Sequence, residues 1–147
     1  MGDRQNRDLR VGFDSRLKLK FLGSQITTDA GLLAYRELEG ALGLSALSVE
    51  RLQDSRLGQN QQHGLLPLLC QSVSSRLAGY EDVDDARGLH VDPAMRHVVG
   101  GRASQPVKQA ASTREVGRFE TEILSTKGNL TALMNLSGRW IDQVHRR

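Results

Sequence analysis

The sequence predicts a mainly α-helical protein, a small helical domain with a short N-terminal β-hairpin or strand. Leucine dominates the apolar residues, and leucine favours helix over sheet. Apolar residues recur at helical spacing through most of the chain, and only its beginning alternates apolar with polar residues. With 147 residues, 38% hydrophobic and 4% aromatic, the chain can build one compact domain around Leu, Val and Ala.

The N-terminal part is predicted to be a flexible arm over residues 1–10, followed by one helical region over residues 11–147. The arm is polar and charged. Residues 11–13 and 17–21 then alternate apolar with polar, separated by the polar residues 14–16, which indicates a hairpin or a single strand. An isolated two-stranded hairpin is marginal in water, so we expect its packing partner to lie elsewhere, inside or outside this chain.

The first helix is predicted over residues 30–42, before Gly43, with Thr27, Thr28 and Asp29 as an N-cap cluster. A second helix is expected over residues 45–52, and residues 53–64 read as a polar loop. The apolar stripe of the first helix comprises Leu32, Tyr35, Leu38 and Leu42, which lie at helical spacing.

Residues 65–80 carry the clearest helical pattern, and we expect them to form the core helix. The single cysteine excludes an internal disulfide, and its apolar surroundings favour a buried thiol over a nucleophile. The apolar stripe of this helix consists of Leu66, Leu69, Cys70, Val73, Leu77 and Tyr80.

Acidic residues 81–85 offer two interpretations, a cation site or the capping of a short helix over residues 85–90. Capping is favoured, because carboxylates stabilise a helix N-terminus whereas Ca²⁺ and Mg²⁺ need several converging oxygens. Asp92 and Pro93 are typical of the N-cap and first position of a further helix, which Gly100 and Gly101 end.

Residues 103–122 are the candidate functional stretch, with a helix expected to start at Ser112 and Thr113. Val116 and Phe119 would lie on one face, and Arg114 and Arg118 on another. Two guanidinium groups beside hydroxyls suit phosphates and base edges, whereas an ordinary amphipathic helix with a solvated face has the same pattern. The candidate DNA-binding residues are Lys108, Ser112, Thr113, Arg114 and Arg118.

The last helix is expected to be capped by Asn129 and to run almost to the end of the sequence. Its apolar stripe includes Leu130, Leu133, Met134, Trp140, Ile141 and Val144.

Charge and motif content restrict the function classes. The net charge is +3, and residues 1–20 and 96–127 each hold six basic residues against three acidic ones, which permits an anionic partner. There is no zinc-ligand spacing, phosphate-binding loop or serine nucleophile motif. Neither a signal peptide nor an apolar membrane segment is visible, so we expect a cytoplasmic protein.

Four sequence blocks resemble, in this order, the N-terminal part of bacterial insertion-sequence transposases of the DDE group 1 type. The resemblance covers roughly residues 10–147. Its most specific parts are RLAGYEDVDDARGLHVDP, the ASQP and GRFE pair, and WIDQVH, although the segment between ASQP and GRFE is longer than in the shortest family forms. The blocks are TTDAGLLAYRELEGALGL, HGLLPLLCQSVSSRLAGYEDVDDARGLHVDPAMRHVVGG, ASQPVKQAASTREVGRFETEIL and NLTALMNLSGRWIDQVHRR.

The resemblance implies DNA transposition by a ribonuclease-H-like fold, in which three carboxylates bind two divalent metals, typically Mg²⁺. It places the first catalytic Asp on a strand after the WIDQVH helix. Asp82, Asp84, Asp85 and Asp142 match no catalytic position, so we predict a fragment without catalytic residues or a cofactor of its own, truncated before the ribonuclease-H-like domain.

Three functional interpretations remain. The first is a transposase fragment that binds DNA, for example terminal inverted repeats, without strand transfer. The second is a helical module that docks on full-length transposase through Leu130, Met134, Trp140 and Ile141. The third is a decayed gene product without function. Missing packing surfaces also predict oligomers or poor solubility.

Overall fold

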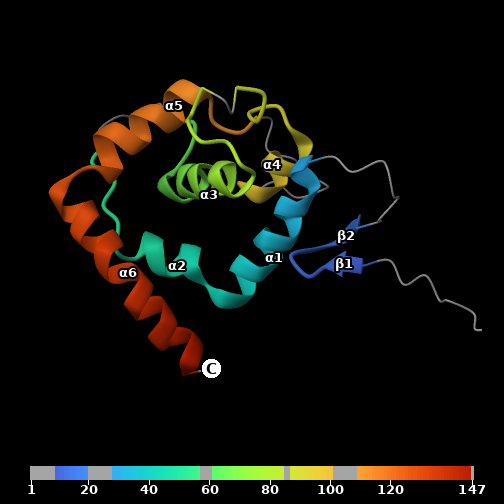
Figure 1. Ribbon diagram of the computed structural model, residues 1–147, viewed down its shortest axis with the longest axis horizontal. Helices are drawn as coiled ribbons and strands as arrows, with labels where there is room; N and C mark the ends of the chain where they lie inside the picture. The colour runs from blue at the N-terminus through green and yellow to red at the C-terminus, as the bar shows by residue number, and fades with distance from the viewer. Residues whose placement is uncertain (1–8, 20–27, 57–60, 85–86, 101–108, 147) are drawn as a thin grey trace, which may run out of the picture.

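The computed structural model describes residues 9–19, 28–56, 61–84, 87–100 and 109–146, and it confirms a mainly helical protein. Helix α3 (Leu65–Leu77) lies in the middle, and the other helices are arranged around it (Figure 1). These are α1 (Leu32–Leu42), α2 (Leu44–Val49), α4 (Pro93–Val98), α5 (Thr113–Arg118) and α6 (Lys127–His145). None of the described helices is both long and apolar enough to cross a membrane.

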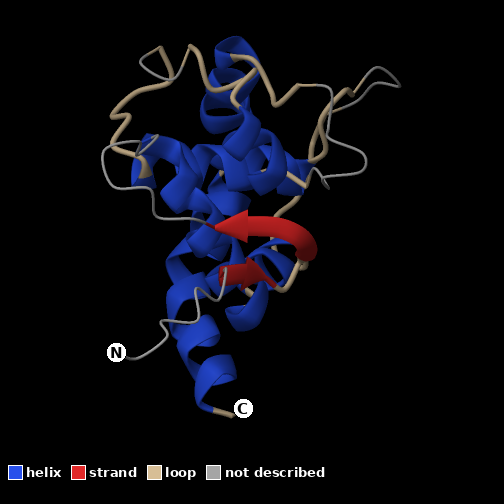
Figure 2. Ribbon diagram, turned by 90° about the vertical axis from the view of Figure 1, so that its right-hand side faces the viewer, coloured by secondary structure: helices blue, strands red, loops and turns tan. Residues whose placement is uncertain are grey.

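Two antiparallel strands, β1 (Leu9–Val11) and β2 (Asp14–Leu19), lie beside the helices at the N-terminal side (Figure 2). The turn falls at Gly12 and Phe13, and the predicted turn at residues 14–16 is wrong because these residues belong to β2. Of the predicted flexible arm, residues 1–8 lie outside the described part of the chain, and residues 9–10 lie in β1.

The hairpin turn docks on α1. Oε2 of Glu37 accepts hydrogen bonds from the backbone N–H of Gly12 at 2.9 Å and of Phe13 at 3.3 Å. The Arg36 guanidinium carbon lies 5.5 Å from the centre of the Phe13 ring, a distance that suits a cation–π contact. A Cβ at Gly12 would come within 2.7 Å of Glu37 Oε1, so glycine permits this close approach.

The start of α1 differs from the prediction. A 3-10 turn, η1 (Thr28–Gly31), precedes the helix, and Gly31 occupies the N-cap without a side-chain hydrogen bond. The predicted cap is therefore wrong at Thr28 and Asp29, and Thr27 lies outside the described residues. Gly43 ends α1 as predicted, with a left-handed φ of 74° that favours glycine. The predicted stripe is only partly buried: Leu32 is buried, but Tyr35 and Leu38 are exposed.

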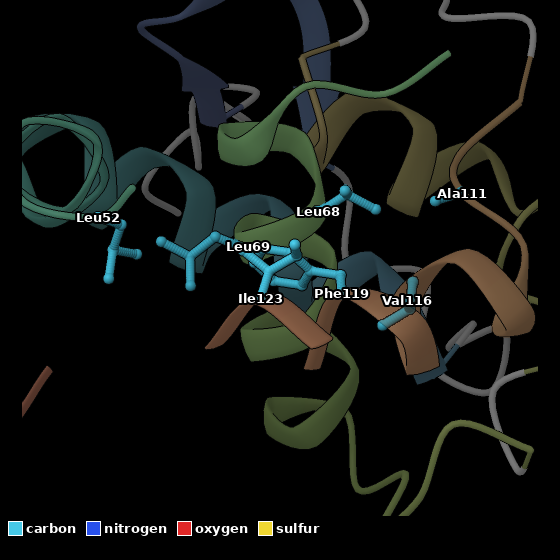
Figure 3. Close-up of a cluster of buried hydrophobic side chains, with 7 residues drawn as sticks. All are labelled: Leu52, Leu68, Leu69, Ala111, Val116, Phe119 and Ile123. Atoms are coloured by element: carbon cyan, nitrogen blue, oxygen red, sulfur yellow. The ribbon is translucent and has the colours of Figure 1, made fainter. Parts of the chain in front are cut away.

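Two hydrophobic clusters form the core. The first joins α1 to α4, and the second joins α3 to α5 and to the π-helix η2 (Phe119–Leu124). Phe119 and Leu68 of the second cluster are each 1% exposed, and Figure 3 shows the buried side chains of this cluster. The first cluster comprises Leu32, Leu89, Met95, Val98, Val99 and Ala110, and the second Leu52, Leu68, Leu69, Ala111, Val116, Phe119 and Ile123.

Helix α3 is the central helix, as predicted, but most of its predicted apolar stripe is not buried. Leu69 is buried, whereas Val73 is 44% and Leu77 50% exposed. The buried face instead carries polar side chains that have hydrogen-bond partners, which removes the usual cost of burying them. These polar residues are Gln71, Ser72 and Ser75.

Helix α4 confirms the expected start, because Oδ1 of Asp92 accepts the N–H of Met95 at 2.8 Å and Pro93 follows at the first helical position. The helix predicted over residues 85–90 is wrong where the chain is described: residues 87–91 form turns. Gly100, with φ of 116°, follows the end of α4.

Helix α6 is capped by Thr126, whose hydroxyl accepts the N–H of Asn129, so the predicted cap at Asn129 is wrong. Asn129 is buried instead, and its amide group bonds both the N–H of Gln53 at 2.8 Å and the C=O of Gln53 at 2.9 Å. Further along, Nε1 of Trp140 donates to the carbonyl of Leu42 at 3.2 Å. The apolar stripe of this helix is largely exposed: Met134 is 82% exposed, and Leu130 and Ile141 are exposed as well, which agrees with the expected missing packing surface.

Candidate nucleic-acid interface

The candidate stretch begins with a complete capping box, which confirms the predicted helix start. Oγ of Ser112 accepts the N–H of Glu115 at 3.3 Å, and Oε2 of Glu115 accepts the N–H of Ser112 at 2.9 Å. The Ser112 hydroxyl also donates to the same carboxylate at 2.8 Å. Ser112 is therefore committed to holding α5, and its hydroxyl has little left to offer a ligand.

The segment before α5 is held by a buried amide of α3. Nε2 of Gln71 donates to the C=O of Ala111 at 2.7 Å, and the N–H of Ala111 donates to Oε1 of Gln71 at 2.8 Å. The N–H of Ala110 donates to the C=O of His90 at 2.9 Å. Sequence reasoning missed Gln71, because its partner lies 40 positions away.

The two predicted faces of α5 are present. Val116 and Phe119 are buried in the second cluster, and Arg114 and Arg118 are exposed. The π-helix after Arg118 was not foreseen. A carboxylate fixes it to α3: Oε1 of Glu120 accepts from Ser72 Oγ at 2.6 Å and from Arg76 Nη1 at 2.7 Å.

Arg118 is paired on the surface. Its Nη2 lies 3.1 Å from Oε2 of Glu122, and both side chains are largely exposed, at 65% and 55%. The hydrogen bond with Glu122 raises the pKa of Arg118 and lowers that of Glu122. A phosphate would have to compete with this carboxylate, so Arg118 is the weaker of the two candidate arginines.

Arg114 is exposed and has no ion pair among the residues that the structure describes. It lines an open surface hollow together with half-buried Thr113 and with Asp82 and Asp84. Negative charge therefore lies beside this guanidinium, which disfavours phosphate on the hollow side and leaves its outward side for a ligand. Lys108, the remaining candidate, lies outside the described residues.

A second group of polar side chains gathers on the other side of α5. Nδ1 of His63 lies 3.1 Å from Oε1 of Glu115, and its Nε2 lies 3.2 Å from the carbonyl oxygen of Gln109. Burial alone would raise the pKa of Glu115, but the hydrogen bonds from Ser112 and from His63 outweigh it and lower this pKa. His63 was seen in the sequence only as one of four scattered histidines.

The described residues do not fit a divalent metal. No three His, Cys, Asp or Glu side chains in the described ranges are close enough together to hold an ion. Asp82 and Asp84 share their hollow with the cationic Arg114, which cannot ligate a metal.

Comparison with known proteins decides the family. A family model described as the transposase DDE domain group 1 matches residues 9–147. The chain belongs to this family. Transposases of the DDE type perform DNA transposition and use divalent metals, so DNA is the partner that this membership suggests. No curated protein and no solved structure matches the chain.

Proposed function

We propose that this chain acts as a helical DNA-binding region of a DDE transposase and contacts DNA, at an element's terminal inverted repeats, through the exposed face of α5. In this proposal the described residues bind DNA without performing strand transfer, and the lack of a cluster of metal ligands among them supports it. The observation that carries the proposal is the exposed Arg114, a guanidinium without an ion pair among the described residues, in a chain of a DNA-transposing family.

The geometry supports a rigid contact. Arg114 lies within the capping box, between Ser112 and Glu115, and the segment before the box is held by Gln71 through two hydrogen bonds. A guanidinium on a fixed helix loses less conformational freedom on binding than one on a loose loop. Arg118 lies one turn further along and would join after its pair with Glu122 opens.

The experiment is DNA binding by fluorescence anisotropy as a function of salt, comparing the unchanged chain with Arg114→Ala. Loss of one phosphate contact is expected to weaken binding and to reduce the slope of log K against log salt by about 0.9. Arg118→Ala is expected to have a smaller effect. The matched control is Arg139→Ala, which removes another exposed arginine, from α6. Equal affinities and slopes for Arg114→Ala and the unchanged chain would rule out the assignment.

The second candidate function is docking on a full-length transposase through α6. It is favoured by the exposure of Met134, together with that of Leu130 and Ile141 on the same helix. Trp140 does not belong to this candidate surface, because its indole N–H donates to the backbone carbonyl of Leu42 within the chain. Co-purification with the full-length enzyme that is lost in Met134→Glu, without any binding to terminal DNA, would select this function over the first.

A further inference from the structure

We propose that the hollow beside Arg114 reads DNA sequence: the Asp84 carboxylate accepts the amino group of cytosine in the major groove, so that this end of α5 selects G·C pairs. The inference rests on the proposed function, in which Arg114 binds the DNA backbone, and adds a sequence preference to it. The hollow is open and holds about 420 Å³. It is lined by Asp82, Val83, Asp84, Thr113, Arg114 and Gly117.

Asp84 belongs to the acidic stretch for which the sequence offered a cation site or the capping of a helix. The described part of the chain supports neither role, because residues 87–91 form turns and no cluster of metal ligands is present there. The Asp84 side chain is exposed, and it has no hydrogen bond or ion pair with the residues that the structure describes. Its carboxylate is therefore free to meet a group from outside the chain.

Both walls of the hollow are held in place. On one side, Val83 packs against the second hydrophobic cluster, and the N–H of Arg87 donates to the backbone carbonyl of Asp84 at 3.2 Å. On the other side, the capping box fixes the start of α5. A carboxylate on an anchored turn loses less conformational freedom on binding than one on a loose loop.

Gly117 adds no side chain to the hollow. A Cβ at this position would meet no atom within 4 Å, so packing within the described chain does not require a glycine here. Glycine weakens a helix relative to alanine. The bare backbone does, however, allow the flat edge of a base to come close.

The charges of the hollow suit a base better than a phosphate. Two carboxylates beside one guanidinium repel a phosphate, whereas a neutral base edge offers hydrogen-bond donors. In the major groove, the adenine amino group lies between two acceptors, adenine N7 and thymine O4. The cytosine amino group has an acceptor, guanine O6, on one side only, so a carboxylate approaches it with less repulsion.

The test measures binding by fluorescence anisotropy to three duplexes of equal length: alternating dG–dC, alternating dI–dC and alternating dA–dT. Inosine lacks only the minor-groove amino group of guanine, so the dI–dC duplex keeps the major-groove pattern of dG–dC. We expect the unchanged chain to bind these two duplexes equally well, and to bind dA–dT about 5- to 100-fold more weakly.

Asp84→Asn should abolish this preference. Asparagine keeps the shape of the side chain, but its amide suits adenine, and the lost negative charge should strengthen binding to the dA–dT duplex. The matched control is Glu81→Gln, which removes the same charge from an exposed residue outside the hollow and should keep the preference.

Gly117→Leu is the second variant, and it does not depend on Asp84. The added side chain should fill the hollow and remove the preference without lowering Tm, since leucine favours helix over glycine. Gly128→Leu adds the same side chain to α6, where a Cβ also meets no atom within 4 Å, and should leave the preference intact.

Three results would overturn the base-reading hollow: equal binding to all three duplexes, dI–dC bound as weakly as dA–dT, or a preference that persists in both hollow variants. In each case Arg114→Ala would still weaken binding if the proposed function holds. If Arg114→Ala leaves binding to every duplex unchanged, the proposed function fails, and the sequence preference assigned to this hollow fails with it.

Discussion

The two faces of α3 differ in polarity, and the buried face is the more polar of the two. The face toward α5 and η2 buries an amide and two hydroxyls beside Leu68, whereas the opposite face exposes Val73 and Leu77. The buried polar groups have partners: Gln71 bonds Ala111, Ser72 bonds Glu120, and Ser75 bonds the carbonyl of Gln71. Which side of a helix is buried therefore depends on the groups that face it as well as on its own hydrophobicity.

The apolar face of α3 opens into a groove of about 140 Å³ between α1, α2 and α6. The apolar side chains that line the groove come from several helices and include Tyr35, Leu77 and Leu133, and Cys70 also lines it. Burial raises the pKa of the Cys70 thiol, which agrees with an unreactive cysteine. The polar face thus fixes the start of α5, and the apolar face is the one that remains open.

The largest expected effect is on the polar face. Gln71→Leu keeps the volume of the side chain but leaves the buried N–H and C=O of Ala111 without partners, which should lower the free energy of unfolding by about 2–6 kcal/mol, or about 1–3 kcal/mol for each orphaned group. Urea unfolding measures the change. Val73→Ala, on the exposed face of the same helix, is the matched control and should stay within about 0.5 kcal/mol. Similar losses in the free energy of unfolding for both variants would show that the two faces do not differ in their contribution to stability.

A smaller effect, dependent on pH, is expected at Glu120. Burial would raise the pKa of Glu120, but hydrogen bonds from Arg76 and Ser72 outweigh this and lower it. A carboxylate whose pKa is lower in the folded chain stabilises the fold at pH values above its pKa in the unfolded chain. This contribution is lost as the pH falls through the folded-state pKa. Because Arg76 is half exposed, Glu120→Gln should cost about 1 kcal/mol or less at neutral pH.

This difference between Glu120→Gln and the unchanged chain should vanish in acid, toward about pH 3. Denaturant titrations across that range provide the measurement. A difference that persists unchanged into acid would show that the pair with Arg76 does not stabilise the connection between α3 and η2.

The smallest effect on stability, and the clearest on association, is expected for Met134→Glu. The side chain is almost fully exposed, so the free energy of unfolding should change by no more than about 0.5 kcal/mol. Self-association through the apolar surface should decrease, as measured by light scattering. Asn135→Glu adds the same charge one position along and should leave association unchanged. A chain that is already monomeric, with a sharp thermal transition, would contradict the expectation of poor solubility or oligomers.

Local rules predicted the features that depend on neighbouring residues. The capping of α4 by Asp92, the start of α5 at Ser112, and the burial of Val116 and Phe119 were all predicted from patterns a few residues long. These signals succeed because a cap and a helical stripe are set by groups within one or two turns.

Features that depend on distant partners could not be predicted. Asn129 resembles a cap, but Thr126 takes that role and the asparagine bonds Gln53, 76 positions away. The buried face of α3 was misjudged for the same reason, since Ala111 and Glu120 supply its partners. At the candidate interface, the sequence indicates Arg114 and Arg118 together. Only the structure separates Arg114, which has no ion pair among the described residues, from Arg118, which is paired with Glu122.

The way α6 is attached has a consequence for the order of folding. Asn129 binds Gln53 and Trp140 binds Leu42, so this helix closes contacts across 76 and 98 positions of the chain. Closing such long loops is slow relative to forming local helices. We expect α1, α2 and α3 to form early. The packing of α6 against them, and with it the enclosure of the second core cluster, is then a late step in folding. During that interval the apolar face of α3 is exposed together with the stripe of α6 that later remains at the surface.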